Sequence, residues 1–293
     1  MAQKITLFSI LDNLLLRFKS QDRKSIIDKY GQFRKVFDDF NGGDIDLKKV
    51  NKDLVCRFEE YLQYVRKCKK NSSSYYIRTF RAIYNRAVRA EYIEDKRPFT
   101  NVFTGNEKTV HRALDIPTLK RMFQYEPKNK KEKQALDIFM LCFYFRGMAP
   151  IDLLSLSKRQ IENGIITYRR RKTGQLLYIK IEPEAMRIIK NYITEDSDLV
   201  FASLMEYDYK TIQARVNKHL KQIGKELKIP IPMTMYVARH SWASIARDKN
   251  IDIPVISQAL GHDNIETTRI YLSSINNKII DTANRKVINS VLK

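Results

Sequence analysis

Two stretches near the carboxyl end of the sequence combine side chains that can do chemistry on a phosphate ester. YVARHSWASIA places Arg239 beside His240, and LGHDNIETTRIYL sets His262 nine residues before Tyr271. A phenol can attack phosphorus, guanidinium groups can stabilise the charge of a pentacoordinate phosphorane, and an imidazole can move a proton. Taken alone, Tyr271 is one of sixteen tyrosines and could simply pack in a helix.

Two earlier stretches add cationic groups that this chemistry would use. In IITYRRRKTGQLLYIKI, β-branched and aromatic residues surround KTG, which predicts a β-hairpin with Lys172 near its turn. FRGMAPIDLLSL contributes Arg146. Breaking a phosphodiester without a metal requires a nucleophile, cations for the oxyanion and an acid for the departing 5'-oxygen. The four stretches together contain residue types for all three tasks.

These motifs carry a family resemblance. R-H-S-W-A, followed by L-G-H and by T-T-x-x-Y ending nine residues after the histidine, resembles the tyrosine recombinases, the family of phage integrases and Xer-type enzymes. YVARHSW and FRGMAPIDLLSL are most similar to the branch found in mobile elements of Bacteroides-type bacteria. The resemblance covers essentially the whole chain, because the helical first third is similar to the family's SAM-like core-binding domain. An additional arm-binding domain is not expected.

The resemblance implies a role for each matching residue. Tyr271 would be the nucleophile, forming a 3'-phosphotyrosyl ester that stores the bond energy, so exchange would need neither ATP nor a metal or other cofactor. Arg239 would contact a non-bridging phosphate oxygen, and Lys172 would protonate the 5'-oxygen. His262 would donate to the phosphate or orient the nucleophile, and His240 would be buried or support the site. The alternatives are that Arg239 is a surface helix arginine, that Lys172 belongs to a basic turn that only touches phosphates, and that His262 merely begins a helix after Gly261.

Two positions depart from the family pattern. Aligning the acidic residue of the first-arginine motif G-L-R-I-S-E-L with Asp152 puts Ala149 where the arginine should stand. Arg146, about one helical turn upstream, is the expected substitute, unless it caps or salt-bridges the helix. Tyr236 takes the place of a histidine. A phenol, whose ordinary pKa is about 10, can donate to phosphate but is a poor base at neutral pH. The alternative for this residue is a core contact.

The charge balance points to a polyanionic partner. Lys and Arg number 54 against 33 Asp and Glu, which gives a net charge of +21. Nucleic acid is the usual partner of such a surface, and a solvated surface that binds nothing is the alternative. Double-stranded DNA is therefore the expected partner. The arginines expected to face it, on a helix beginning near residue 73 and before KTG, are Arg78, Arg81, Arg89, Arg169, Arg170 and Arg171.

Hydrophobic periodicity predicts a mostly α (α+β) protein. The segments with helical spacing in the first third are 5–18, 23–40, 47–67 and 73–91. NSSS at 71–74 supplies N-cap candidates for the last of these helices. The expected domains are a helical core DNA-binding domain at 1–98, a linker at 99–109, and at 110–293 a mainly helical catalytic domain with a small antiparallel β-hairpin.

Other protein classes find little support in the sequence. Cys56, Cys68 and Cys142 are too few and too scattered for a disulfide framework or a zinc site, so no metal is expected. A signal peptide and a membrane-spanning apolar run are both missing from the sequence. We therefore expect a cytoplasmic protein without a membrane partner.

The predicted function is site-specific DNA recombination, as integration, excision or inversion of a mobile or invertible element. The resemblance implies a homo-tetramer on paired DNA sites, in which a C-terminal tail docks onto a neighbour; packing onto its own domain is the alternative. The tail residues available for that contact are Ile279, Ile280, Val287, Ile288 and Val291. The competing functions are a catalytically impaired DNA-binding regulator, motivated by Ala149 and Tyr236, and a type IB topoisomerase-like relaxase.

Overall fold

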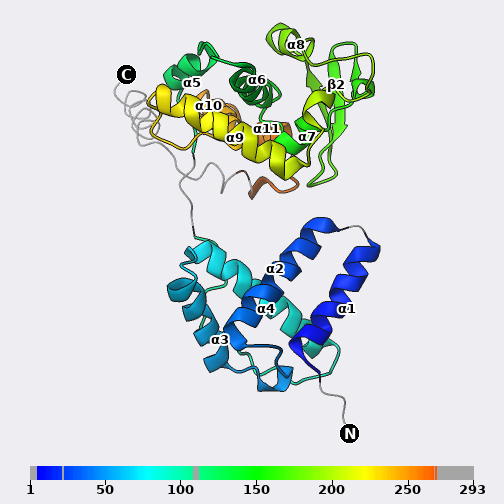
Figure 1. The fold of residues 1–293 in the computed structure, drawn as a ribbon, viewed down its shortest axis with the longest axis vertical. Helices are drawn as coiled ribbons and strands as arrows, with labels where there is room; N and C mark the ends of the chain where they lie inside the picture. The colour runs from blue at the N-terminus through cyan, green and yellow to red at the C-terminus, as the bar shows by residue number, and fades with distance from the viewer. Residues whose placement is uncertain (1–4, 22, 108–111, 267, 269–293) are drawn as a thin grey trace, which may run out of the picture. The chain divides into compact units, whose positions relative to one another are not determined.

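The computed structural model describes residues 5–21, 23–107, 112–266 and 268 of the chain. It divides the chain into two compact units, Met1–Thr109 and Val110–Lys293 (Figure 1). Both are mainly helical, and a small antiparallel sheet lies in the second. The predicted mostly α fold is therefore confirmed. The tail segment expected to dock onto a neighbouring protomer lies outside the described residues.

Among its described residues, the first unit has four α-helices, which pack around an aromatic core. They are α1 (Leu7–Ser20), α2 (Lys24–Asn41), α3 (Lys52–Glu60) and α4 (Lys70–Arg89). A 3-10 turn at Leu47–Lys49 precedes α3, and a π-helical turn at Tyr61–Val65 continues it. The rings of Phe33, Phe37, Phe58 and Phe80 meet at the centre, with centroids 5.1 to 6.3 Å apart. The helices therefore share one core.

The start predicted for the fourth helix is wrong. α4 begins at Lys70, with Lys69 as its N-cap, so the NSSS stretch lies inside the helix. Ser73 and Ser74 are buried, and the Ser74 hydroxyl donates to the carbonyl of Gly105 at 2.6 Å. Serine is tolerated in a helix interior when its hydroxyl finds such a partner. A tertiary contact, and not a cap, explains this serine.

The segment expected to be a linker packs in part on the first unit. Phe99 is 9% exposed, and its ring lies 5.3 Å from that of Phe80 and 5.6 Å from that of Tyr84. The backbone N–H of Phe103 donates to the Glu59 carboxylate at 3.0 Å. Pro98 and Gly105 interrupt the helical pattern, but the contacts of Phe99 and Phe103 hold the segment on the helices.

The second unit is built around α6. Its helices are α5 (Ile116–Phe123), α6 (Lys130–Tyr144), α7 (Pro150–Leu154), α8 (Pro183–Ile189), α9 (Tyr209–Glu226), α10 (Met235–Asp248) and α11 (Ile253–Leu260). Asp115, Asn129 and Asp208 cap α5, α6 and α9 through their side chains. α6 packs against α7, α8, α9 and α10 (Figure 1). None of the helices that the structure describes is long and apolar enough to cross a membrane.

A three-stranded antiparallel sheet, in the order β1-β2-β3, covers one side of this core. Its strands are β1 (Ile161–Glu162), β2 (Ile165–Arg169) and β3 (Leu176–Lys180). Ile166 stands opposite Ile179 and Tyr168 opposite Leu177, and all four are buried. The alternation in β2 and β3 follows the period of two expected for a sheet with one buried face. The predicted hairpin is confirmed, and its turn spans residues 170–175.

Candidate active site

Arg239, on α10, is anchored inside the second unit. Only 4% of its surface is exposed. Its Nη1 donates to the carbonyl of Gly147, and its Nη2 donates to the carbonyl of Leu260 at 2.7 Å. A guanidinium stays charged when buried and needs acceptors of this kind. Arg239 therefore ties the turn after α6 to the end of α11 and holds a positive charge between them.

The turn after α6 closes tightly on Arg239. Arg146 and Gly147 both have left-handed backbone angles, with φ of 55° and 72°, which glycine adopts without strain. A Cβ atom on Gly147 would lie 2.9 Å from Cγ and 3.1 Å from Cα of Arg239. Only glycine fits at this position, and it lets the FRGM segment reach the α10 backbone.

His262 follows the glycine that ends α11. Gly261 has a φ of 65°, and the N–H of His262 donates back to the carbonyl of Ser257 at 3.0 Å, as in a helix C-cap. The imidazole Nε2 lies 3.0 Å from Nη2 of Arg239, and Nδ1 lies 2.7 Å from the hydroxyl of Thr268. Because a guanidinium only donates, Nε2 must accept, and the imidazole proton lies on Nδ1.

The surroundings of His262 keep its imidazole neutral. Burial, followed by the positive charges of Arg239, Arg170 and Lys172, lowers its pKa from 6.5 to about 4. Both effects disfavour a further positive charge. At neutral pH His262 is therefore a hydrogen-bonding group and not a third cation.

Lys172 stands on the turn between β2 and β3. The turn is closed by the N–H of Arg170 donating to the carbonyl of Gln175 at 2.9 Å and by Gly174, whose φ is 76°. The Lys172 side chain is exposed, and its charge contributes to the low pKa of His262. The hairpin thus brings an exposed ammonium group into the electrostatic environment of the Arg239 and His262 pair.

Asp152 is a buried carboxylate beside the same site. From the sequence alone it has no role except as the residue that aligns the first-arginine motif. It is 5% exposed, and its Oδ1 accepts the backbone N–H of Arg171 at 3.1 Å. Burial raises its pKa, against the opposing effect of that hydrogen bond and of the charges of Arg170, Arg171 and Arg239. The carboxylate therefore offsets part of the positive charge around the site and pins the hairpin turn to α7.

The three arginines before Lys172 have different environments. Arg169 and Arg171 are exposed, and Arg169 donates to the carbonyl of Gly174 at 3.1 Å. Arg170 is only 6% exposed, and its Nη1 donates to the carbonyl of Gly261. The expectation that Arg170 faces DNA is therefore corrected, because its side chain points into the unit. The alternation of β2, with Ile166 and Tyr168 buried, was the sequence signal for this inward direction.

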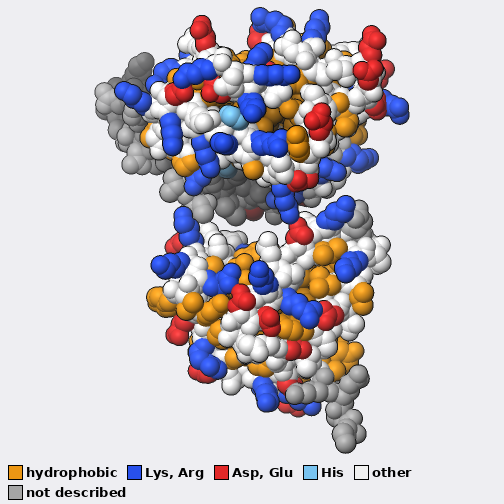
Figure 2. All heavy atoms as spheres, viewed as in Figure 1, with side chains coloured by type: hydrophobic (Ala, Val, Ile, Leu, Met, Phe, Trp, Pro, Cys, Tyr) orange, Lys and Arg blue, Asp and Glu red, His pale blue; other side chains and the backbone are white. Residues whose placement is uncertain are grey.

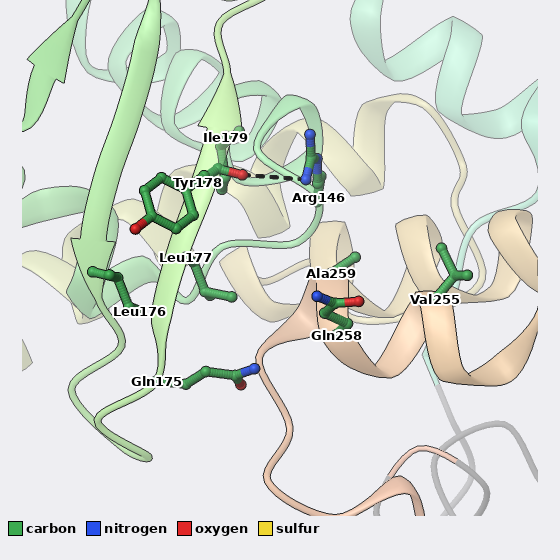
Figure 3. Close-up of a pocket in the computed structure, with 9 residues that line it drawn as sticks. All are labelled: Arg146, Gln175, Leu176, Leu177, Tyr178, Ile179, Val255, Gln258 and Ala259. Carbon is green, nitrogen blue, oxygen red and sulfur yellow. Dashed lines mark hydrogen bonds between the residues drawn. The ribbon is translucent and has the colours of Figure 1, made fainter.

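Arg146 lies beside a cavity between β3 and α11. Its Nη1 donates to the carbonyl of Tyr178 at 3.3 Å, as drawn in Figure 3. The cavity has a volume of about 340 Å³, and its polar lining includes Gln175 and Gln258. The guanidinium is thus held along β3, and the structure gives no contact between it and Arg239 or His262 among the described residues.

The remaining predicted site residues have different positions. Tyr236, on the first turn of α10, is 41% exposed and is therefore not the core contact considered as an alternative. His240, on the same helix, is half-buried. Tyr271 lies outside the described residues, three positions after Thr268, which contacts the His262 ring.

The arginines predicted to face DNA from the first unit lie on one side of α4. Arg81 and Arg89 are exposed and Arg78 is half-buried, while Ile77 and Phe80 are buried on the other side. Nη1 of Arg81 is 3.3 Å from the Thr104 hydroxyl. Lys and Arg side chains also spread over the visible surface of each unit (Figure 2). The three arginines therefore lie on the side of α4 that faces away from its buried residues.

The arrangement is suited to holding an anion. Arg239, Arg170 and Lys172 surround a neutral His262, so the excess charge near the imidazole is positive. A phosphate oxygen is the natural partner for such a set of donors. Within the part of the chain that the structure describes, no group of three His, Cys, Asp or Glu side chains is placed to hold a metal ion.

Comparison with known families places both units. Residues 112–278 match the family model described as the phage integrase family, and residues 6–103 match the one described as a phage integrase SAM-like domain. The first match alone covers more than half of the 293 residues.

Curated proteins of similar sequence bear related names. The chain is 30% identical over 170 residues to "Tyrosine recombinase XerA" of Pyrococcus furiosus, an alignment that covers 56% of this chain and 58% of that protein. It is 25% identical over 257 residues to "Tyrosine recombinase" of Pseudothermotoga lettingae, covering 83% and 84%. The chain thus spans a little over half of the first relative and most of the second.

Solved structures share the fold. The Tn1549 transposon integrase (aa 82–397) in complex with circular intermediate DNA has a TM-score of 0.76 at 12% identity, covering 97% of this chain and 99% of that one. The lambda integrase (75–356) dimer bound to a COC' core site has a TM-score of 0.68 at 16% identity, covering 92% and 95%. At these identities the likeness shows the fold. The two family models, of which the first alone covers more than half of the chain, establish that this chain belongs to the phage integrase family.

Proposed function

We propose that the protein is a site-specific DNA recombinase that cuts and rejoins duplex DNA through a 3'-phosphotyrosyl intermediate. The observation that carries this proposal is the buried Arg239, whose Nη2 lies 3.0 Å from a neutral His262 beside the hairpin of Lys172. The relatives named tyrosine recombinases support the same activity. An inactive DNA-binding regulator would not need a desolvated cation held in this way.

The proposed reaction exchanges one phosphodiester for another. The Tyr271 hydroxyl attacks phosphorus and gives up its proton to His262 or to solvent, its oxygen forms the new P–O bond, and the bond to the 5'-oxygen breaks. Lys172 gives its proton to the departing 5'-oxygen, which leaves as a hydroxyl group. The 5'-hydroxyl of another strand then attacks the phosphotyrosyl ester and returns its proton to Lys172, and the Tyr271 oxygen leaves and takes back a proton as its hydroxyl group. The number of phosphodiester bonds is conserved, so the cycle consumes no ATP. No step of the proposed cycle uses a metal ion.

Arg239 and His262 would stabilise the charge that builds on the non-bridging oxygens. Preorganised donors of this kind are worth more in a site that excludes water. Arg239 is already held by two carbonyl groups, so its guanidinium would need little reorganisation when phosphate arrives. A neutral His262 can accept a hydrogen bond from the tyrosine hydroxyl at Nε2, or donate one to phosphate once its proton moves from Nδ1 to Nε2, without adding charge.

Three further residues have proposed supporting roles. Arg146 would replace the arginine missing at Ala149 by exchanging its 3.3 Å contact with the Tyr178 carbonyl for a phosphate oxygen. The exposed phenol of Tyr236 would donate to phosphate, and His240 would support α10 beside Arg239. Each of these roles requires a rearrangement or contact made only with DNA bound.

We propose double-stranded DNA as the substrate and a homo-tetramer on paired sites as the active assembly. The half-buried Arg78 and the exposed arginines of α4, β2 and the β2–β3 turn would contact phosphates. The exposed ones are Arg81, Arg89, Arg169 and Arg171. The reaction would integrate, excise or invert a mobile element of the Bacteroides-type branch, in the cytoplasm. The assignment of two domains joined near residues 99–109 fits the two compact units.

The experiment is cleavage of a nicked suicide substrate. The DNA site is first located by footprinting around the gene, and the nicked duplex is then offered to wild type and to Tyr271→Phe. Wild type should form a protein–DNA adduct that survives denaturation, and the variant should bind the same site without forming it. Binding without any adduct from wild type would instead favour the regulator.

A further inference from the structure

We propose that Arg170 is a positioning residue that locks the turn bearing Lys172 onto the turn bearing His262. This proposal rests on the proposed function, in which those two side chains act on the same phosphate. Arg170 itself would touch neither DNA nor the reacting atoms. Its role would be to fix the distance between two groups that come from segments ninety residues apart in the chain.

The Arg170 side chain points into the second unit, toward the end of α11. It is 6% exposed although it follows β2 directly in a basic run, and its Nη1 donates to the carbonyl of Gly261. The hydroxyl of Thr173, from the same turn, is 3.3 Å from the same carbonyl oxygen. Two donors of the hairpin thus converge on the peptide group immediately before His262.

The hairpin packs tightly against Gly261. A Cβ atom there would lie 2.8 Å from Cδ1 of Leu177 and 3.0 Å from Cδ of Arg170. Contacts this short leave no room for a methyl group between the hairpin and the end of α11. The side chains of the hairpin therefore pack directly on the backbone of Gly261, and a shift of one turn displaces the other.

Two buried guanidinium groups each donate to one of two consecutive carbonyl groups. The carbonyl of Leu260 accepts from Arg239, and that of Gly261 accepts from Arg170. His262 comes next, and its Nε2 is 3.0 Å from Arg239. Arg239 and Arg170 thus hold the peptides before the imidazole from two sides.

The buried charge of Arg170 has a nearby carboxylate, Asp152. A buried guanidinium is costly without a nearby anion, and Asp152 supplies one, since the charges of Arg170, Arg171 and Arg239 all act on its carboxylate. The same carboxylate accepts the N–H of Arg171 at 3.1 Å, next to Arg170 in the turn. Asp152 therefore stabilises both the charge of Arg170 and the backbone that carries it.

Arg169 provides a matched control for Arg170. It is the preceding residue of the same run, has the same charge, and is exposed, with one contact to the Gly174 carbonyl. Replacing Arg169 by glutamine should weaken DNA binding and lower the salt dependence of binding by about one charge. Replacing Arg170 by glutamine should leave DNA affinity within about threefold and slow the chemical step on the order of 10- to 100-fold, as expected for a lost charge-assisted hydrogen bond.

The test measures adduct formation in a single turnover at saturating protein, with DNA affinity and its salt dependence measured separately, for Arg170→Gln, Arg170→Lys and Arg169→Gln. The lysine variant keeps a cation able to reach the Gly261 carbonyl and should recover part of the rate. Thr173→Val removes the other donor without disturbing the buried charge, so it should slow the reaction by a few fold even if Arg170→Gln does not fold. Wild-type rates in a folded Arg170→Gln, or the same losses as Arg169→Gln, would overturn the proposal.

A second readout does not depend on catalysis. The four histidines can be titrated by NMR, with His262→Gln used to assign the resonance of His262. Arg170→Gln should raise the pKa of His262, because one of the charges that lower it is removed, and Arg169→Gln should leave that pKa unchanged. An unchanged His262 pKa in Arg170→Gln would overturn the proposal even if wild type formed no adduct. A missing adduct with the expected pKa change would instead count against the proposed function alone.

Discussion

Gly147 is the point where the turn after α6 meets the backbone of Arg239, and the substitution Gly147→Ala perturbs that contact directly. The new Cβ would lie 2.9 Å from Cγ and 3.1 Å from Cα of Arg239, and 3.2 Å from Cδ2 of Leu260. The Cα cannot move away by a change of rotamer, so α10 or the turn must shift. The shift would also disturb the hydrogen bond from Arg239 to the Gly147 carbonyl.

Two contributions set the size of the effect. Alanine in a left-handed conformation costs about 1–2 kcal/mol, and overpacking a well-filled interior costs about 1–3 kcal/mol more. Gly147→Ala should therefore lower the free energy of unfolding of the second unit by about 2–5 kcal/mol. Gly164, between β1 and β2, has nearly the same φ, 73°, and nothing within 4 Å of the added Cβ. Gly164→Ala should then cost only the first 1–2 kcal/mol or so.

The assay is urea unfolding followed by the fluorescence of Trp242, the only tryptophan of the chain. Trp242 lies on α10 one turn after Arg239, so it reports the unit that carries both glycines. The expected result is a larger loss for Gly147→Ala than for Gly164→Ala, by on the order of 2 kcal/mol. Equal losses would refute the tight packing of Arg239 against Gly147.

Three further predictions concern charge and burial. The unfolding free energy should fall as the pH drops from 6.5 towards 4, because His262 binds a proton in the unfolded chain that it does not bind in the folded protein. The loss, after solvent screening, should be about 1–2 kcal/mol. Unfolding free energies measured over this pH range should change less in His262→Gln than in wild type. Cys142 is buried with its pKa raised to about 12, so iodoacetamide at pH 8 should alkylate the half-buried Cys56 and Cys68 far sooner, and mass spectrometry showing equal rates would contradict this burial. Arg239→Lys keeps the charge but cannot hold both carbonyls, so cleavage should fall on the order of 10²- to 10³-fold while DNA binding persists; unchanged cleavage would remove Arg239 from the site.

Much of the fold could be predicted because local patterns agree with tertiary packing. The apolar face of α4, with Ile77 and Phe80, and the alternation of β2 and β3 follow directly from periodicity. Arg239 and His262 were paired by their resemblance to a family motif, and the structure places their side chains 3.0 Å apart. Periodicity alone would not have joined two helices separated by a loop.

The features that could not be predicted from the sequence depend on contacts between residues far apart in the chain. NSSS looks like a helix cap, but Ser74 instead reaches the Gly105 carbonyl across the first unit. Arg169, Arg170 and Arg171 are chemically identical. The alternation of β2 indicates that Arg170 lies on the buried side, but the carbonyl that its side chain reaches belongs to Gly261, in a distant segment of the chain. The buried Asp152 beside them was missed as a site residue for the same reason: its neighbours come from distant segments.

The central claim is that Tyr271 becomes covalently joined to the 3'-phosphate of cut DNA. The most direct measurement is to trap the adduct on a suicide substrate, digest the protein with protease and the DNA with nuclease, and identify the nucleotide-bearing peptide by mass spectrometry. Our account predicts that the modification maps to Tyr271 among the sixteen tyrosines, with the nucleotide attached through its 3'-phosphate. A modification on another residue, or attachment through a 5'-phosphate, would contradict it.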